Sequence, residues 1–206
     1  MSYFVDLLSH FDSHLHGWCA AYGTWAIALL ALIIFAETGT LIFPFLPGDS
    51  MLFVVGIFCA AGHLPFTLTA VVLVAAAVAG DLLNYSVGRY CGTRLVRRWP
   101  WICSGHAMAN AHFARHGSKT IVIARFVPVL RGFAPFAAGF ATMSSQRFLT
   151  YNVLGGALWV LSLMSLGWVI GDHPWVRQNL SRTILLIIVV SLIPTVLGLL
   201  RRRTVA

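Results

Sequence analysis

Four ionisable side chains stand inside otherwise apolar stretches of this 206-residue sequence. They are the acids Glu37 and Asp49 and the arginines Arg125 and Arg131. An ionised group at the middle of a bilayer costs roughly 2.5–3.5 kcal/mol, so four isolated ones would cost on the order of 10 kcal/mol. Such groups are stable there only if they meet one another, water or a charged ligand. Two arginine forks suit a phosphate, and carboxylates in a low dielectric take up protons readily. The set therefore predicts a site that binds an anionic headgroup through its arginines and couples to protons through its acids.

Proline and glycine interrupt both stretches close to these charges. The residues at which we expect hairpin breaks are Pro44, Pro47, Gly48, Pro128, Gly132 and Pro135. Arg125 and Arg131 are six residues apart, so on an unbroken helix they would point about 120° apart. Pro128 removes a backbone donor and disfavours helix at the preceding residue, so a break there can turn both guanidinium groups towards one place. The alternative is a structural role, in which the four charges form buried salt bridges that fasten the two segments together.

A second polar group interrupts the apolar stretch between the two charged segments. It consists of Asp81, Asn84 and Tyr85, which are candidates for lining a transport pathway. Asp81 could line a transport pathway or bond across helices, and the sequence supports both interpretations equally. Gly155, Gly156 and Trp159 are expected to pack helices together.

The composition predicts that the apolar stretches around these charges lie in a membrane. The hydrophobic fraction is 59% and the charged fraction 10%, against about 45–50% and 25% in soluble domains. The net charge of +8 is spread over short runs between apolar stretches, which sets the orientation of a membrane protein and does not suggest a nucleic-acid interface. The four cysteines form no CxxC pair, and no HExxH or nucleophile–base pattern is present. We therefore expect no metal, no cofactor and no enzymatic activity.

The fold class that follows is an all-α polytopic membrane protein. We expect an amphipathic interfacial helix over 1–24, one membrane domain over 25–200, and a basic cytoplasmic tail over 201–206. Within the membrane domain the expected elements are a hairpin over 25–62, a span over 66–88, a cytoplasmic basic loop over 89–119, a hairpin over 120–146, and spans over 148–171 and 183–200. The two apolar legs of the first hairpin are each about 16 Å long, half of a roughly 30 Å hydrocarbon core. One full span from about Trp25 to Leu46, with Glu37 buried in it, is the alternative.

Basic residues predict the orientation of these elements. The 89–119 loop holds six basic residues and no acid, and Arg201–Arg203 follow the last expected span, so both are expected in the cytoplasm. The connecting spans then make the first hairpin open outward and the second inward. A hairpin and span used twice in opposite orientation is the inverted repeat of many transporters.

Several segments together resemble the bacterial DedA family. The matching segments are Glu37-Thr-Gly with Pro44-Phe-Leu-Pro47-Gly48-Asp49, then Gly80-Asp81 with Asn84-Tyr85 and Gly88-Arg89, then Lys119 to Arg131 with Ala134-Pro135-Phe, and Tyr151-Asn152 with Gly155-Gly156-Ala-Leu-Trp159. The resemblance runs from about residue 18 to 197. It implies a multi-pass protein of the bacterial inner membrane with two opposed re-entrant hairpins, related to eukaryotic proteins with the VTT (SNARE-associated) domain.

The resemblance also implies a function and roles for residues. Family members serve membrane homeostasis, and some return undecaprenyl phosphate across the membrane. The essential acids of the family carry over to Glu37 and Asp49, and its essential arginines to Arg125 and Arg131. Dependence on the proton motive force is implied in the same way.

The leading hypothesis is a flippase or scramblase for undecaprenyl phosphate or another anionic phospholipid, with protons as the coupling partner and the C-terminus in the cytoplasm. The alternatives are a proton-coupled transporter of small ions and a membrane assembly factor that transports nothing. The sequence does not determine the oligomeric state, and a homo-oligomer is one of the states that it allows.

Overall fold

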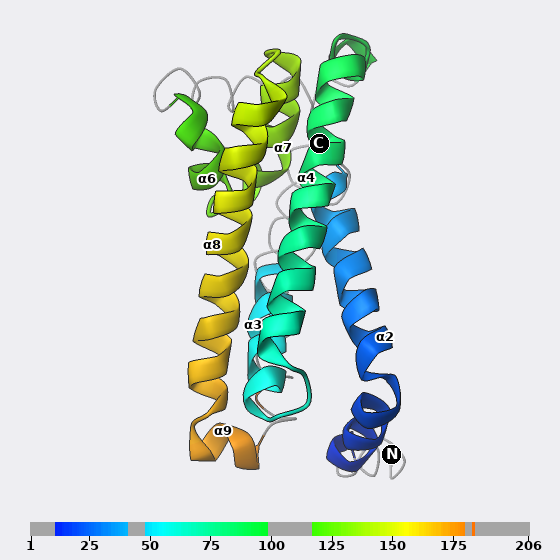
Figure 1. Cartoon of the computed structure of the whole chain (residues 1–206), viewed down its shortest axis with the longest axis vertical. Coiled ribbons are helices and arrows are strands. Elements are labelled where there is room, and N and C mark those ends of the chain that lie inside the picture. Colours follow the sequence, from blue (N-terminus) through cyan, green and yellow to red (C-terminus); the bar gives the residue numbers. More distant parts are fainter. Residues whose placement is uncertain (1–10, 41–47, 99–116, 180–182, 184–206) are drawn as a thin grey trace, which may run out of the picture. The chain divides into compact units, whose positions relative to one another are not determined.

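Helices make up all the regular structure that the computed structural model describes, which covers residues 11–40, 48–98, 117–179 and 183 (Figure 1). The helices are α2 (Phe11–Gly39), α3 (Gly48–Ala60), α4 (Phe66–Arg98), the 3₁₀ turn η1 (Gly117–Lys119), α6 (Thr120–Ala124), α7 (Pro128–Phe140), α8 (Ser145–Gly171) and α9 (Pro174–Gln178). The prediction of an all-α chain is confirmed. The predicted span over 183–200, apart from Thr183, and the tail over 201–206 lie outside the described residues.

Two helices are long and apolar enough to cross a bilayer. The apolar stretches are Phe66–Gly92 in α4 and Ser145–Gly171 in α8, each of 27 residues. At 1.5 Å per residue each measures about 40 Å, which exceeds a hydrocarbon core of about 30 Å. The helices predicted over 66–88 and 148–171 are therefore present. α4 continues to Arg98, so the predicted loop is wrong over 89–98, because no proline interrupts the helix before Pro100.

The first charged segment differs from its prediction at its start. α2 is one helix of 29 residues, so no break separates the predicted interfacial helix from the leg that starts at Trp25. No proline stands between Phe11 and Gly39 to make one. α2 ends at Gly39, and residues 41–46 of the alternative span from Trp25 to Leu46 lie outside the described residues. Pro44 and Pro47 lie outside the described residues, and Gly48 begins α3.

The second charged segment is broken where the sequence predicts it. α6 ends at Ala124, Val127 is extended with φ −115° and ψ 108°, and Pro128 opens α7. Proline suits this first position, since it has no N–H to leave unpaired. Gly132 and Pro135 are not breaks, because both lie inside α7. Phe133, Ala134, Phe136 and Ala137 are buried around Pro135, so packing maintains the helix where one backbone hydrogen bond is missing.

The chain forms two compact units, and the unit with residues 29–46 and 70–161 contains most of the charged residues singled out above. Within it, α4 and α7 cross with their backbones in contact. A Cβ atom on Gly139 would lie 2.0 Å from the Tyr85 carbonyl oxygen, and one on Gly88 would lie 2.1 Å from that of Phe136. Glycine at both positions is what permits this close crossing.

Within the same unit the chain turns back between α6 and α7. Ile121 near the start of α6 and Ala138 near the end of α7 share a buried cluster with Tyr85 and Phe148. The Tyr85 and Phe148 rings stack with centroids 4.3 Å apart. The break between α6 and α7 therefore lies at the opposite end of this hairpin from the Tyr85 cluster. Arg125 directly follows α6, and Arg131 lies in the first turn of α7.

The other unit contains residues 1–28, 47–69 and 162–206, and in its described part α3 packs on the second half of α8. A Cβ atom on Gly56 would lie 2.2 Å from the Met164 carbonyl oxygen, and one on Gly167 would lie 2.0 Å from that of Phe53. Ile57 of α3 and Val176 of α9 are buried together. α9 lies between the segments predicted as spans over 148–171 and 183–200.

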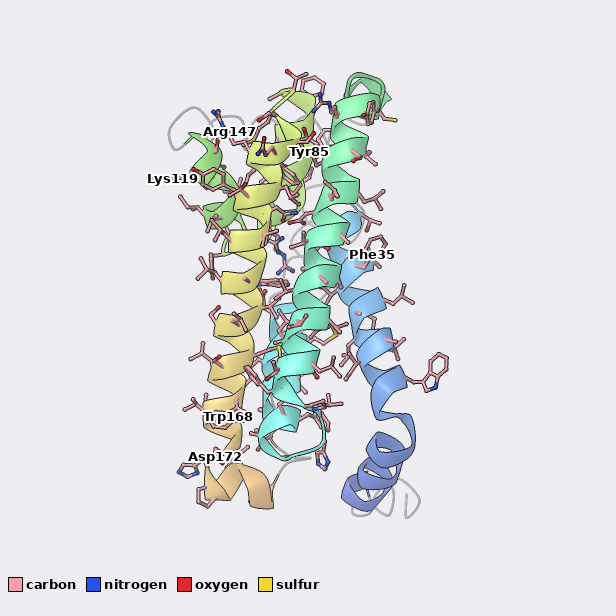
Figure 2. All side chains as sticks on the ribbon, in the orientation of Figure 1. Phe35, Tyr85, Lys119, Arg147, Trp168 and Asp172 are labelled. Atoms are coloured by element: carbon pink, nitrogen blue, oxygen red, sulfur yellow. The ribbon has the colours of Figure 1, made fainter. Side chains whose placement is uncertain are left out.

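Large apolar side chains point outward along α8 (Figure 2). Leu154, Leu158 and Val169 are 53%, 55% and 63% exposed. A soluble protein rarely shows such a continuous apolar surface, whereas lipid tails accept it.

Candidate functional site

One buried ion pair joins α2 to α7. Arg131, one turn into α7, donates from Nη2 to the Glu37 carboxylate near the end of α2. The Glu37 side chain is 3% exposed and that of Arg131 14%. Asn84 of α4 holds the same turn of α7 in place, because its side-chain amide donates to the Gly132 carbonyl oxygen at 2.8 Å. Asn84 thus positions the backbone next to Arg131.

A second buried ion pair joins α4 to Arg125, the residue that directly follows α6. Arg125 donates from Nη2 to the Asp81 carboxylate and to the side-chain oxygen of Asn152 at 2.6 Å. Asn152 in turn donates to the Val78 carbonyl oxygen of α4 at 3.0 Å. The side chains of Arg125 and Asp81 are 6% and 5% exposed. Each arginine therefore has its own carboxylate.

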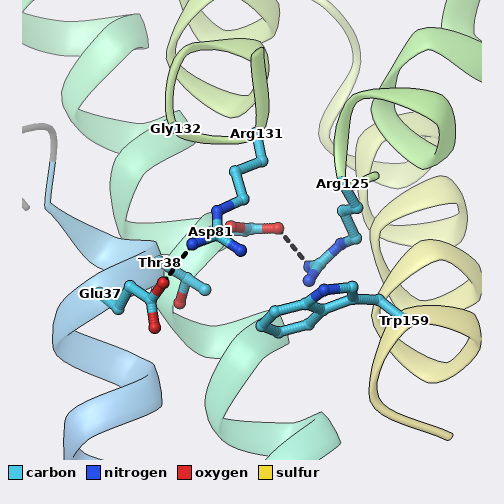
Figure 3. A pocket seen from close by; sticks show the side chains of 7 residues that line it. All are labelled: Glu37, Thr38, Asp81, Arg125, Arg131, Gly132 and Trp159. Atoms are coloured by element: carbon cyan, nitrogen blue, oxygen red, sulfur yellow. Dashed lines mark hydrogen bonds and ion pairs between the residues drawn. The ribbon is translucent and has the colours of Figure 1, made fainter. Parts of the chain in front are cut away.

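Both ion pairs line one small pocket. Its walls are Glu37, Thr38, Asp81, Arg125, Arg131, Gly132 and Trp159, and Figure 3 shows the two guanidinium groups pointing inward from above the Trp159 indole. Their Cζ atoms lie 5.8 Å (Arg125) and 5.6 Å (Arg131) from the centroid of that ring, so one indole makes a cation–π contact with each. The water-sized space inside is about 20 Å³, which holds about one water molecule.

Two adjacent glycines of α8 make room for the Arg125 side chain. A Cβ atom on Gly155 would lie 3.2 Å from Arg125 Cδ, and one on Gly156 would lie 3.4 Å from Arg125 Nη2. Both glycines are buried inside a helix, where each costs about 1 kcal/mol relative to alanine. Their packing role is as expected, but what they pack against is a charged side chain.

The structure brings together three of the four charges that the sequence singled out. Glu37, Arg125 and Arg131 line the same pocket, and the break at Pro128 does direct both arginines to one place. Asp49 lies in the first turn of α3, in the other unit, so it is not part of the site described here. Asp81 bonds across helices, as one of its two interpretations predicted, and it also lines the pocket. Its role in a transport pathway stays a prediction.

Tyr85 makes packing contacts instead of lining the pocket. Its hydroxyl donates to the Met143 carbonyl oxygen and accepts from Arg89 at 2.7 Å. Its role in a transport pathway stays a prediction, as does that of Asn84.

The sequence reasoning missed two residues of the site. Asn152 is predicted only as part of a family segment, although an amide inside an apolar span is a signal of interhelical hydrogen bonding. Trp159 is predicted to pack helices, and the spacing of a single tryptophan carries no signal for a contact with two arginines.

Fold and site together define an all-helical membrane protein with paired charges in its interior, and comparison with known proteins agrees. The family model described as the VTT domain matches residues 46–169. Protein DedA of Escherichia coli K12 is 40% identical over 213 residues, covering 99% of this chain and 95% of DedA. The chain therefore belongs to the DedA family of VTT-domain membrane proteins.

Other relatives are also membrane proteins. An uncharacterized membrane protein of Mycobacterium leprae is 37% identical over 187 residues, covering 88% of this chain and 84% of its own length. Inner membrane protein YqjA of Escherichia coli K12 is 38% identical over 149 residues, covering 71% and 68%. No solved structure matches the chain significantly.

The assignment of carboxylates to arginines predicts which double substitutions restore stability. Arg131→Gln alone leaves the Glu37 charge buried without its partner, which costs about 3–5 kcal/mol. Adding Glu37→Gln should recover most of that loss, measured as the free energy of unfolding in detergent. The matched control combines Arg131→Gln with Asp172→Asn, an exposed acid that is not among the residues lining the pocket, and the effects of its two changes should nearly add. Equal recovery in both doubles would contradict the assignment.

Proposed function

We propose that this protein moves an anionic lipid, undecaprenyl phosphate or another anionic phospholipid, across the bacterial inner membrane with proton coupling. The observation that carries the proposal is a single buried pocket in which two arginines, each neutralised by its own carboxylate, lie over one indole. Family membership supports it, since the resemblance implies lipid handling and essential roles for Arg125 and Arg131.

The phosphate would bind by replacing the carboxylates. Space for about one water molecule cannot hold a phosphate while both ion pairs are closed. An arginine that leaves a carboxylate keeps its fork of donors, and that fork fits phosphate oxygens equally well. The closed ion pairs thus correspond to a ligand-free state that exchanges one anion for another.

Proton coupling would act through the acids. When Glu37 takes up a proton, it stops competing for Arg131, and the arginine becomes available to a phosphate. Asp49 is the second proton-coupling acid of this proposal, supported by its position at the start of α3, directly after the Pro-Gly segment, and by the family resemblance.

The chain would place this site in the bilayer by means of two opposed re-entrant hairpins. The turn between α6 and α7 supports the second of these, because both of its ends lie near the Tyr85 cluster. The limited length of α3, 13 residues or about 20 Å, supports the first. Lys119 directly before α6 and Arg147 at the start of α8 both lie at the end of the second hairpin that is opposite its helix break (Figure 2). Basic residues at this end favour a cytoplasmic entrance and a cytoplasmic C-terminus.

Removal of either arginine tests the phosphate role. In proteoliposomes, Arg125→Ala and Arg131→Ala should abolish movement of labelled undecaprenyl phosphate between leaflets. Arg125→Lys and Arg131→Lys keep the charge beside each acid but lose the fork, so movement should slow by about ten- to a hundredfold. Arg147→Ala, at an exposed position of α8, is the matched control and should move lipid normally. If the lysine variants fold and transport as the wild type does, the phosphate role is wrong.

Glu37→Gln tests the coupling. Glutamine resembles the protonated acid but can neither take up nor release a proton, so transport by this variant should no longer respond to an imposed pH gradient. Glu37→Asp retains a carboxylate and should keep the response, and Asp49→Asn should weaken it. The rate is measured in proteoliposomes with and without the gradient. An undiminished response in Glu37→Gln would exclude this residue from coupling.

Cysteine labelling tests the second hairpin. In a chain whose four native cysteines are replaced by serine, Ser118→Cys and Ser144→Cys stand at the two ends of the α6–α7 turn. Both should react with an impermeant maleimide from the cytoplasmic face only, whereas Asp172→Cys after α8 should react from the outer face. Labelling of Ser118→Cys and Ser144→Cys from opposite faces would mean that this segment crosses the membrane.

A further inference from the structure

Arg125 is held in place by contacts other than its ion pair with Asp81. Asn152 already holds the Arg125 guanidinium at 2.6 Å and is itself fixed to the α4 backbone. The slot formed by Gly155 and Gly156 confines the stem of the same arginine. Arg125 would therefore keep its place if its bond to Asp81 opened.

Arg125 also keeps donor capacity beyond these bonds. Both of its side-chain hydrogen bonds in the described residues use Nη2. Its Nε is buried and has no hydrogen-bond partner among them. A guanidinium has five N–H donors, and a buried donor left unpaired costs about 1–3 kcal/mol. The ion pair with Asp81 thus leaves Arg125 incompletely satisfied, as expected of a side chain that also binds something else.

The charge balance of the pocket sets how many protons a ligand requires. The charged groups of the described residues that face Asp81 are Arg125, Arg131 and Glu37, so two positive and two negative charges sum to zero. Unbalanced charge in a low dielectric is strongly unfavourable. A phosphodiester brings one negative charge and is balanced when one acid is protonated. A phosphomonoester brings two above its second pKa of about 6, and then both acids must be protonated.

We propose that Asp81 is a second gating carboxylate, which occupies Arg125 in the ligand-free state and takes up a proton when a lipid phosphomonoester binds. This inference rests on the proposed function and adds to it a residue, a proton count and a preferred ligand class. Each acid takes one proton from water, the arginines stay charged, and the dianionic headgroup replaces two carboxylates. Asp49 is not among the residues lining the pocket, and its proton belongs to a step other than headgroup binding. With Glu37 as the only titrating acid of the pocket, the pocket would match a phosphodiester instead.

Proton uptake on binding measures this directly. The full-length protein in detergent is titrated by calorimetry at about pH 8 in buffers of different ionisation enthalpy, with farnesyl phosphate as the monoester and dihexanoyl phosphatidylglycerol as the diester. The wild type should take up about two protons per monoester bound and about one per diester. Asp81→Asn should take up about one per monoester, whereas Asp81→Glu should keep the wild-type number. Asp172→Asn, an exposed acid after α8, is the matched control and should behave as the wild type.

The outcomes separate this inference from the proposed function. A wild type that binds neither probe overturns the proposed function. A wild type that binds the monoester with uptake of only one proton, or an Asp81→Asn variant with unchanged uptake, overturns the role of Asp81 and leaves the proposed function standing. If Asp81→Asn does not fold, the wild-type counts for the two probes decide, together with the phosphorus NMR shift of the bound monoester. A headgroup that stays dianionic takes up no proton itself, and a single gating acid then gives the same uptake for both probes.

Discussion

Charge neutralisation inside an apolar fold is the constraint on which the rest of this structure depends. Two arginines and two acids are buried in one unit, and each pair joins helices that are distant in sequence: α2 with α7, and α4 with the end of α6. The helix break at Val127–Pro128, the amides of Asn84 and Asn152, and the glycines of α8 all serve to bring these charges within reach of one another. Without that convergence, each charge would face the penalty of an isolated ion in a low dielectric.

The same arrangement explains why buried ion pairs need not be purely structural. Replacing such pairs by apolar residues is often neutral or stabilising in proteins, so stability alone is a weak reason for a membrane protein to contain two of them. An arginine that can exchange a carboxylate for a phosphate gives a stronger reason. Trp159 fits this interpretation, because an indole face attracts both guanidinium groups without competing for their N–H donors.

Prediction from the sequence succeeded where a signal was local. Charges in apolar runs identified Glu37, Arg125 and Arg131, and the ring of Pro128 located the break between α6 and α7. It failed where the outcome depends on packing between helices. Pro135 lies in a helix because buried neighbours support it, and α4 runs on to Arg98 because polar residues alone do not end a helix. Which acid pairs with which arginine is a property of the folded chain, so the pairing of Arg125 with Asp81 was open until the helices were placed.

The glycine pair at Gly155 and Gly156 has a consequence for attempts to make this protein more robust. Replacing helix glycines by alanine is a common way to raise thermostability, since it reduces the entropy of the unfolded chain. In α8 the added methyl groups would lie 3.2–3.4 Å from the Arg125 side chain. Any gain in helix propensity would therefore be accompanied by displacement of a buried cation. A stabilised variant intended for crystallography or biochemistry should leave these two positions unchanged.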